Sequence, residues 1–286
     1  MTMASRVVVV AATMLMAASS IALDGAGHSA KRHGRSAPTP PPIAGNWKLS
    51  LNDEFRTLDP TRWVQRFWWN GDTFWPTTEL EVYKRANVAA NGELSLTARR
   101  QLGLTNFMGS TNNSTGETFC CSSGLVSTGG IDKVAPVGYS FTYGYIEARI
   151  WIPSGQGIWP AFWMERSDYK DTAEMDIMEV LGGDPATLQM HYHTPGGTFG
   201  RAYMAPSPLS DGWHTYALLW EPGKLVWYLD GVPRFTHKGD DVDSHPHNII
   251  FNLAVGGSQS WPGAPDSTTR FPSVMRIDWL RVWQMS

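Results

Sequence analysis

The sequence predicts an all-β protein, a single sandwich or barrel of short antiparallel strands. Alternating apolar and polar segments recur about every ten residues from Asn46 onward, with turn-forming residues between them. The 286-residue chain contains 28 Gly and 19 Pro, which suits an architecture with many turns. No stretch carries the apolar period of a helix of three turns. We therefore expect residues 46–286 to form one β domain.

Individual segments support this class in order along the chain. Residues 143–152 alternate and stop at Pro153. Residues 214–220 and 225–229 flank Pro222-Gly223, and Asp230-Gly231 follows, so we expect two strands bounded by turns. Residues 248–253 and 275–283 have the same alternation. Residues 100–130 are rich in Gly, Ser, Thr and Asn, which is typical of a long loop, here expected to lie over the sheet.

The N-terminal residues have the pattern of an export signal. Arg6 is followed by an apolar run over residues 7–18 and by small residues up to Ala22. The run is shorter than the roughly 20 residues that cross a bilayer. We expect a signal peptide over residues 1–22, with Ala30 as the alternative cleavage position, and a Pro/Gly/Ser-rich linker over 23–45. The expected protein is secreted, extracellular or periplasmic, with no membrane contact after cleavage.

The charge of the chain and its cysteine content limit the partners and the cross-links that it can have. The 23 Lys and Arg against 26 Asp and Glu give a net charge of −3, which argues against a nucleic-acid partner. The two cysteines, Cys120 and Cys121, are adjacent, so an ordinary disulfide staple is excluded. They form either a strained vicinal ring or two thiols, and a zinc site would need further ligands.

Three carboxylates stand close together in a segment with strand character. On a regular strand Glu174 and Asp176 share a face, whereas Met178 would take the place expected for Glu179. A β-bulge after Asp176 would return Glu179 to the same face, and bulges re-aim side chains beside active sites. Repulsion among three carboxylates on one face should raise at least one pKa.

Such a carboxylate set suits glycoside hydrolysis, which needs an ionised nucleophile and a protonated acid. Two other interpretations stay open, a solvated strand face and a calcium site. The segment Gly157–Met164 lies just upstream and contains Trp159 and Trp163, flat rings of the kind that stack on sugars. This neighbourhood favours catalysis on a carbohydrate.

Taken together, these segments resemble glycoside hydrolase family 16 over residues 46–285, in its laminarinase-like branch with the bulged acid motif. The matching segments are Asp53–Phe55, Glu79–Tyr83, Asn91–Leu94, Tyr143–Arg149, Gly157–Met164, Glu174–Glu179, Asn252–Gly257 and Ile277–Val282. The resemblance implies a β-jelly-roll of two curved antiparallel sheets with a concave substrate cleft. Two segments depart from the laminarinase pattern, Lys170–Ala173 and Val180–Pro185, and the second resembles bacterial exopolysaccharide β-glycanases. The polymer is therefore left open.

The resemblance also implies roles for individual residues. Glu174 would be the nucleophile, Glu179 the general acid/base, Asp176 the residue between them, and His193 a histidine close to the acid/base. His191 shares its strand face, but with the acids accounting for the chemistry we expect no catalytic metal. The implied substrate-binding residues are Trp159, Trp163, Glu79, Arg85, Asn252 and Trp261. An aromatic cluster with Trp68, Trp69 and Trp75 would either form acceptor subsites or pack an edge loop, and we add Trp68 and Trp75 to the substrate-binding residues. A structural calcium is implied at Glu54, the Gly92 carbonyl and Asp278.

The function expected from the sequence is endo-hydrolysis of β-glycosidic bonds with retention, on a β-1,3 or mixed β-1,3-1,4 glucan. Alternatives are an exopolysaccharide or galactan substrate, transglycosylation on the same site, and a non-catalytic carbohydrate-binding module. No cofactor is expected for catalysis, and a monomer is expected with a polysaccharide as its partner.

Overall fold

The computed structural model describes residues 37–69, 71–72, 78–106, 109–129, 138–171 and 173–286. Pro38–Ser286 form one compact unit. The predicted signal peptide and most of the predicted linker lie outside the described residues. Residues 38–45 belong to the compact unit. Ile43 and Trp47 pack against the same hydrophobic cluster, and the carbonyl of Ile43 accepts a 2.8 Å hydrogen bond from Nε1 of Trp47. The domain thus begins before the predicted boundary at residue 46.

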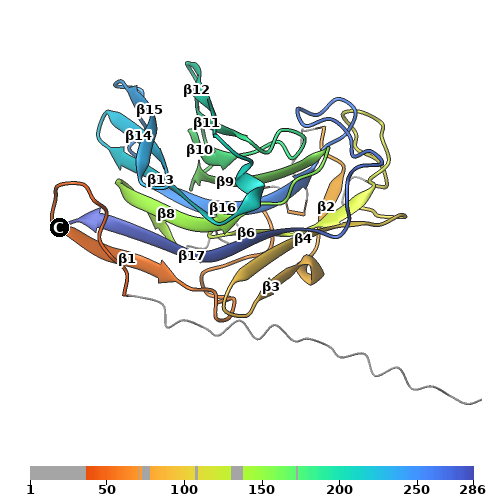
Figure 1. Cartoon of the computed structure of the whole chain (residues 1–286), viewed down its shortest axis with the longest axis horizontal. Helices are drawn as coiled ribbons and strands as arrows, with labels where there is room; N and C mark the ends of the chain where they lie inside the picture. Colours follow the sequence, from red (N-terminus) through yellow and green to blue (C-terminus); the bar gives the residue numbers. More distant parts are fainter. Residues whose placement is uncertain (1–36, 70, 73–77, 107–108, 130–137, 172) are drawn as a thin grey trace, which may run out of the picture. The chain divides into compact units, whose positions relative to one another are not determined.

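The described residues form two β-sheets, as predicted (Figure 1). The first sheet has ten strands; its main path is β15 (Val232–Lys238), β14 (Lys224–Leu229), β13 (His214–Glu221), β8 (Gly144–Trp151), β17 (Ser273–Met285), β4 (Leu94–Arg100), β5 (Cys121–Ser123) and β2 (Glu81–Tyr83). β1 (Trp47–Asp53) also pairs with β17, and β3 (Val88–Ala90) with β4.

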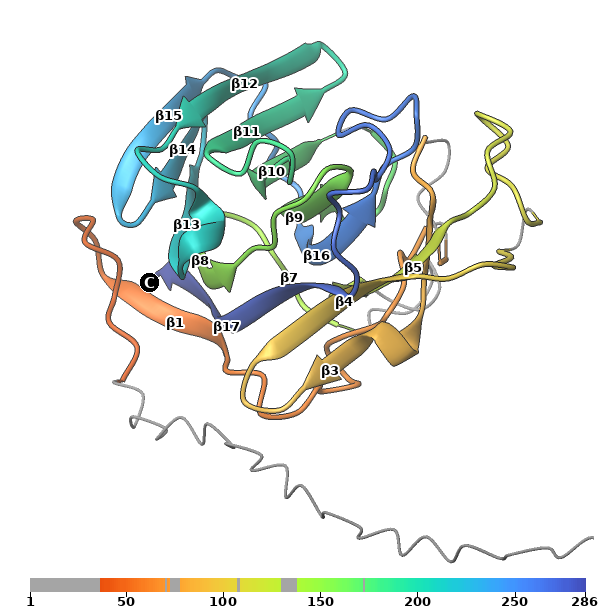
Figure 2. The same cartoon turned by 45° about the vertical axis from the view of Figure 1, so that its right-hand side comes forward.

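The second sheet has seven strands among the described residues; Figure 2 shows most of them side by side. Its path is β12 (Gly197–Met204), β11 (Thr187–Thr194), β10 (Glu174–Glu179), β9 (Ile158–Arg166), β16 (His247–Val255) and β6 (Leu125–Ser127), and β7 (Ser140–Phe141) pairs with β16. The only helices described are two single 3₁₀ turns, η1 (Arg85–Asn87) and η2 (Leu209–Asp211). Accordingly, no described helix has the length and apolar character needed to cross a bilayer.

The strand predictions agree with this architecture, with two exceptions. All five segments predicted as strands are strands, and Asp230 and Gly231 both have positive φ, 51° and 75°, as a type I′ hairpin turn requires. The predicted loop over residues 100–130 is wrong at its end, where β5 and β6 form. The pair β2 with β5 is parallel, unlike the antiparallel pairs elsewhere in the sheets.

The core lies between the two sheets, and alternation decides which side chains enter it. On β10, Met175, Ile177 and Met178 are buried in the main cluster. On the neighbouring β9, Ile158, Phe162 and Met164 enter the same cluster. Residues between these core positions therefore lie on the opposite side of the seven-stranded sheet, which we call the acid face because it carries Glu174, Asp176 and Glu179.

The adjacent cysteines form a disulfide, which decides between the two states that the sequence left open. Cys121 is fully buried at the start of β5, and Cys120 precedes it and is half-buried. The backbone N–H of Cys120 donates to the carbonyl of Leu80, so the disulfide lies beside the segment that leads into β2.

Candidate active site

The predicted bulge is present on β10. Against β11, Asp176 pairs with His191 and Glu179 with Gln189, so three steps on β10 face two on β11. Against β9, the register shifts between Asp176 and Met178. Ile177 and Met178 are consecutive and both buried in the core, which is the signature of the extra residue. Glu174, Asp176 and Glu179 therefore share the acid face.

A tryptophan from the ten-stranded sheet hydrogen-bonds to the backbone at the bulge. Trp227 on β14 is fully buried, and its Nε1 donates a 2.8 Å hydrogen bond to the backbone carbonyl of Asp176. A bulge interrupts the ladder and leaves backbone groups to be satisfied elsewhere. The indole thus holds the strand at the residue where it departs from regular geometry.

Glu179 is held by two side chains from the neighbouring strands. Nε1 of Trp159 on β9 donates to Oε1 of Glu179 over 3.1 Å, and Nδ1 of His191 on β11 is 2.8 Å from Oε2. Both oxygens of this carboxylate are therefore fixed, and the side chain is only 9% exposed. Such positioning suits a group that transfers a proton to one defined atom.

The expectation that His193 lies next to Glu179 is wrong. Nε2 of His193 is 3.1 Å from Oδ2 of Asp176 and 3.8 Å from Oε1 of Glu174. The reason is the strand register, in which His193 lies opposite Glu174, whereas His191 lies opposite Asp176 and is two residues closer to the partner of Glu179. The histidine beside the predicted acid/base is thus His191.

Burial and like-charge repulsion raise the pKa values of two of the acids, Glu174 and Asp176. Burial, and then the Asp176 and Glu165 carboxylates, raise the pKa of Glu174 well above its usual value, while His193 acts in the opposite direction. Burial, and then Glu179 and Glu165, raise the pKa of Asp176 well above its usual value. The side chain of Asp176 is 5% exposed and that of Glu174 23%, so Asp176 is the more deeply buried of the two carboxylates.

Glu165 is a fourth carboxylate at this site, and the sequence analysis missed it. It lies two residues after Trp163 on β9, hence on the same face, and burial raises its pKa to about 7. Its Oε1 accepts a 2.7 Å hydrogen bond from the backbone N–H of Arg166. Extending the alternation from Trp159 and Trp163 by two residues would have found it.

A buried polar network runs from β2 to the aromatic residues of β9. Nε1 of Trp163 donates to Oδ1 of Asn252 over 2.7 Å, and Nδ2 of Asn252 donates to the hydroxyl of Tyr83 over 2.9 Å. Glu81 lies beside Tyr83, and its Oε2 accepts a 2.7 Å hydrogen bond from the N–H of Val255. Asn252, predicted as a substrate contact, thus positions Trp163.

Glu79 joins this network to the acids. It is buried, and burial, followed by Glu81, Glu179 and Glu174, raises its pKa well above the usual value. Glu79, predicted as a substrate-binding residue, therefore lies close enough to the acids to interact with them electrostatically, and its partner Glu81 was not predicted.

The predicted sugar-stacking residues differ in their accessibility. Trp261 is 48% exposed and meets Trp159 edge-on at 5.6 Å and His191 at 5.7 Å, so it borders the acids. Trp163 is only 5% exposed and packs against Phe67 and Trp69, so its ring is much less accessible to a sugar than that of Trp261.

Trp68 is also 5% exposed and lies in the same small cluster, so its prediction as a substrate contact is wrong. The neighbouring Trp69 is half-buried and stacks on Tyr169 at 4.6 Å and 12°, while Trp75 lies outside the described residues.

Arg85 is not brought to the acids. It is exposed in η1, which leads into β3 on the ten-stranded sheet, and no described contact joins it to the acid face. The polar contact predicted for it is therefore absent from the described residues.

The residues implied for calcium fall on adjacent segments. The N–H of Gly92 donates to the carbonyl of Phe55, next to Glu54. Asp278 lies on β17 between the part that pairs with β4, just after Gly92, and the part that pairs with β1, just before Glu54. Oδ2 of Asp278 is 2.9 Å from Nη1 of Arg149, so this carboxylate already has a cationic neighbour. The donors are oxygens, which suit calcium, and its binding stays a prediction.

Comparisons with known proteins agree with this geometry. Residues 82–281 match the family model of glycosyl hydrolases family 16. The chain belongs to glycosyl hydrolases family 16, enzymes that cleave O-glycosyl bonds.

Solved structures and curated relatives point the same way. The catalytic domain of an endo-1,3-beta-glucanase (laminarinase) from Thermotoga petrophila superposes with a TM-score of 0.73 and 31% identity, over 85% of this chain and all of that one. A beta-glucanase of Rhodothermus marinus is 28% identical over 84% of this chain and 86% of its own length. An endo-1,3-1,4-beta-glycanase of Rhizobium meliloti is also 28% identical, over 82% of this chain, which spans only 51% of that protein.

Proposed function

We propose that the protein is a retaining endo-glycosidase that hydrolyses internal bonds of a β-glucan, β-1,3 or mixed β-1,3-1,4. The observation that carries the proposal is the bulged β10, which places Glu174, Asp176 and Glu179 on one face with Glu179 held by Trp159 and His191. The substrate class follows the laminarinase and beta-glucanases named above, which share the fold and about 30% of the sequence.

Each acid takes a role that follows from its surroundings. Glu174 attacks the anomeric carbon while Glu179 gives its proton to the leaving glycosidic oxygen, so the sugar becomes an ester of Glu174. Glu179 then takes a proton from water, whose oxygen bonds to the anomeric carbon and releases Glu174. Asp176 lies between them on β10 and acts on Glu174 through its charge, which raises the pKa of Glu174. No cofactor takes part in these steps.

The test is hydrolysis of laminarin and lichenan by wild type and by Glu174→Gln, measured as release of reducing ends. Gln has nearly the same shape but cannot form the ester, so we expect a loss of about 10³-fold or more. Glu221→Gln is the matched control, because Glu221 pairs with Lys224 at the turn between β13 and β14. Normal hydrolysis by Glu174→Gln would contradict the assignment.

Product analysis separates the proposal from its alternatives. Short oligosaccharides with initial β configuration at the reducing end indicate retaining endo-hydrolysis. Products longer than the starting oligosaccharide would indicate transglycosylation. Activity on an exopolysaccharide or galactan alone would keep the mechanism and replace the substrate. Binding to polysaccharide without any cleavage would contradict the enzyme.

We further propose that the protein is secreted, because residues 1–22 have the pattern of an export signal, and that it is a monomer, the expected state of a secreted domain that acts on a long polymer. N-terminal sequencing of protein recovered from the culture medium tests the first statement. A start after Ala22 or Ala30 is expected, and retention in the cytoplasm with Met1 intact would contradict it.

A structural calcium would be held by Glu54, the Gly92 carbonyl and Asp278. A bound ion would tie together the segments after β1, before β4 and within β17, and so stabilise the ten-stranded sheet. The test is a melting curve with and without a chelator. A lower Tm on chelation, absent in Glu54→Gln, is expected, and equal melting curves would contradict the site.

A further inference from the structure

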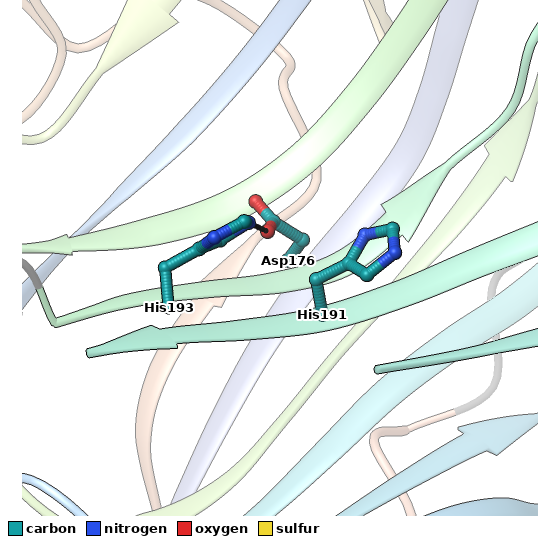
Figure 3. Close-up of side chains that lie close together, drawn as sticks. All are labelled: Asp176, His191 and His193. Carbon is teal, nitrogen blue, oxygen red and sulfur yellow. Dashed lines mark ion pairs between the residues drawn. The ribbon is translucent and has the colours of Figure 1, made fainter. Parts of the chain in front are cut away.

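One side-chain cluster on the acid face has the arrangement of metal ligands. Asp176 on β10 and His191 and His193 on β11 each offer one ligand atom, and these atoms all lie within 4.8 Å of one another. Figure 3 shows the His193 ring directed at the Asp176 carboxylate, with the His191 ring on the other side. The register of β10 and β11 produces this grouping, because His191 lies directly opposite Asp176.

The contact between Asp176 and His193 is not an ordinary hydrogen bond. Oδ2 of Asp176 is 3.1 Å from Nε2 of His193, yet this buried oxygen has no hydrogen-bond partner among the described residues. In a tetrahedral site with metal–ligand bonds of 2.0–2.1 Å, two ligand atoms lie about 3.3 Å apart. The separation therefore fits two atoms that share a cation.

Outer partners fix both imidazole rings. Nδ1 of His193 is 2.8 Å from Oγ1 of Thr198 on β12, which leaves Nε2 facing Asp176. His191 is fixed by its hydrogen bond to Glu179. Metal-binding histidines in proteins have such partners, which hold the ring and its tautomer.

We propose that Asp176, His191 and His193 bind one transition-metal ion of the zinc class, and that the bound ion inhibits the enzyme. Two imidazole nitrogens and one carboxylate oxygen suit Zn²⁺, Ni²⁺ or Cu²⁺, whereas Ca²⁺ and Mg²⁺ prefer oxygen ligands alone. Carboxylates crowd the site, and a cation relieves their repulsion. The side chains of His191 and His193 are 20% and 33% exposed, so an ion reaches them from solvent.

Inhibition follows from what the ion would occupy, and this part rests on the proposed function. The metal would take the carboxylate of Asp176, which otherwise assists Glu174. Its positive charge would lie beside Glu174 and reduce the nucleophilic character of that carboxylate. The ion would also stand where the sugar ring must approach.

Binding is tested by calorimetric titration of the full chain with ZnCl₂ and by the visible absorption of Co²⁺. We expect one site, weakened about tenfold or more in His193→Asn and by 10- to 100-fold in Thr198→Val, which keeps both imidazoles but removes the outer partner. His214→Ala is the matched control, because His214 also pairs with an aspartate, Asp230, but outside the cluster. Wild-type affinity in both His193→Asn and Thr198→Val would overturn the site.

Thermal melting of each variant identifies a folding defect, and Thr198→Val, a substitution on an exposed strand, decides the question if His193→Asn does not fold. For inhibition, wild-type hydrolysis of laminarin should fall as Zn²⁺ fills the site and return after chelation. Thr198→Val should need 10- to 100-fold more Zn²⁺ for the same inhibition. Full activity with the site saturated would refute inhibition. Zinc binding without hydrolysis of any polymer would refute the proposed function and leave the metal site intact.

Discussion

Replacing Trp227 by Phe tests whether the bulge on β10 depends on support from the opposite sheet. The indole N–H is the hydrogen-bond donor described for the carbonyl of Asp176, and it comes from β14 through the core. Phe keeps an aromatic ring in the same place but has no donor. The buried carbonyl at the start of the bulge then loses its donor from the opposite sheet.

The expected loss of stability is the sum of two effects. Leaving a buried carbonyl unpaired costs about 1–3 kcal/mol. The smaller ring leaves space in a fully buried position, which adds about 1 kcal/mol. We expect the free energy of unfolding to fall by about 2–4 kcal/mol, and Tm by about 5–15 °C. Relaxation of the bulge should also misplace Glu179 relative to Glu174 and lower kcat by about 10- to 100-fold.

The matched control is Trp220→Phe. Trp220 is also fully buried, and its Nε1 donates to the backbone carbonyl of Asp243 over 3.0 Å, away from the bulge. Urea unfolding and laminarin hydrolysis of both variants give the comparison. We expect similar destabilisation, but a lower kcat only in Trp227→Phe. An unchanged kcat in Trp227→Phe, or an equal loss in Trp220→Phe, would refute the reasoning.

Three further predictions concern residues of the acid face. Burial raises the pKa of Glu165 to about 7. As the pH rises from about 4.5 to 7.5, the free energy of unfolding of the wild type, measured in urea, should therefore fall by up to about 3 kcal/mol relative to that of Glu165→Gln. Trp261→Ala should raise KM about 2- to 10-fold with little change in kcat or Tm, because its exposed ring contributes to sugar binding. Gly200→Ala should lower kcat, since a Cβ there would lie 2.2 Å from Cδ2 of His191; Gly212→Ala, with open space around it, should not.

The sign of the Glu165 prediction follows from proton uptake. Between the ordinary pKa of a glutamate and the raised pKa of Glu165, the folded protein keeps the Glu165 proton that the unfolded chain has lost. Raising the pH through this range therefore destabilises the folded state, and the loss is complete above the pKa of about 7. A stability difference that does not change with pH would show that Glu165 is not a buried acid. A lower kcat for Trp261→Ala with unchanged KM would argue against sugar binding by that ring. Equal kcat values for the two glycine variants would show that His191 tolerates the added carbon.

Periodicity was sufficient to predict five long strands and the acid face, although not the short strands such as β2, β3, β5 and β6. Alternation places Met175 in the core and Glu174 outside it, and the spacing of Glu179 required the extra residue that the register shift shows. The assignment of His193 failed because the bulge changes which residues of β11 stand beside which acid. That pairing depends on the register between strands, which one strand's own pattern does not determine.

Loops were harder to predict than strands. The aromatic cluster that contains Trp68 suggested sugar binding, but the path of a loop depends on partners far away in the sequence. Here Trp68 packs against the backbone of Gly129, where an added Cβ would lie 2.0 Å from the Trp68 ring. Arg85 failed for the same reason, because the single turn of η1 directs it to solvent. Glu165, in contrast, was accessible to the alternation rule on β9 and was overlooked.

The position of β17 has a consequence for the order in which the protein folds. It follows every other strand in the chain, yet it joins β8 to β4 and also pairs with β1. Before β17 arrives, β15, β14, β13 and β8 can pair on one side and β4, β5, β2 and β3 on the other, each with an open edge. Because the joining contacts span nearly the whole domain, assembly is expected to be slow and to follow completion of the chain.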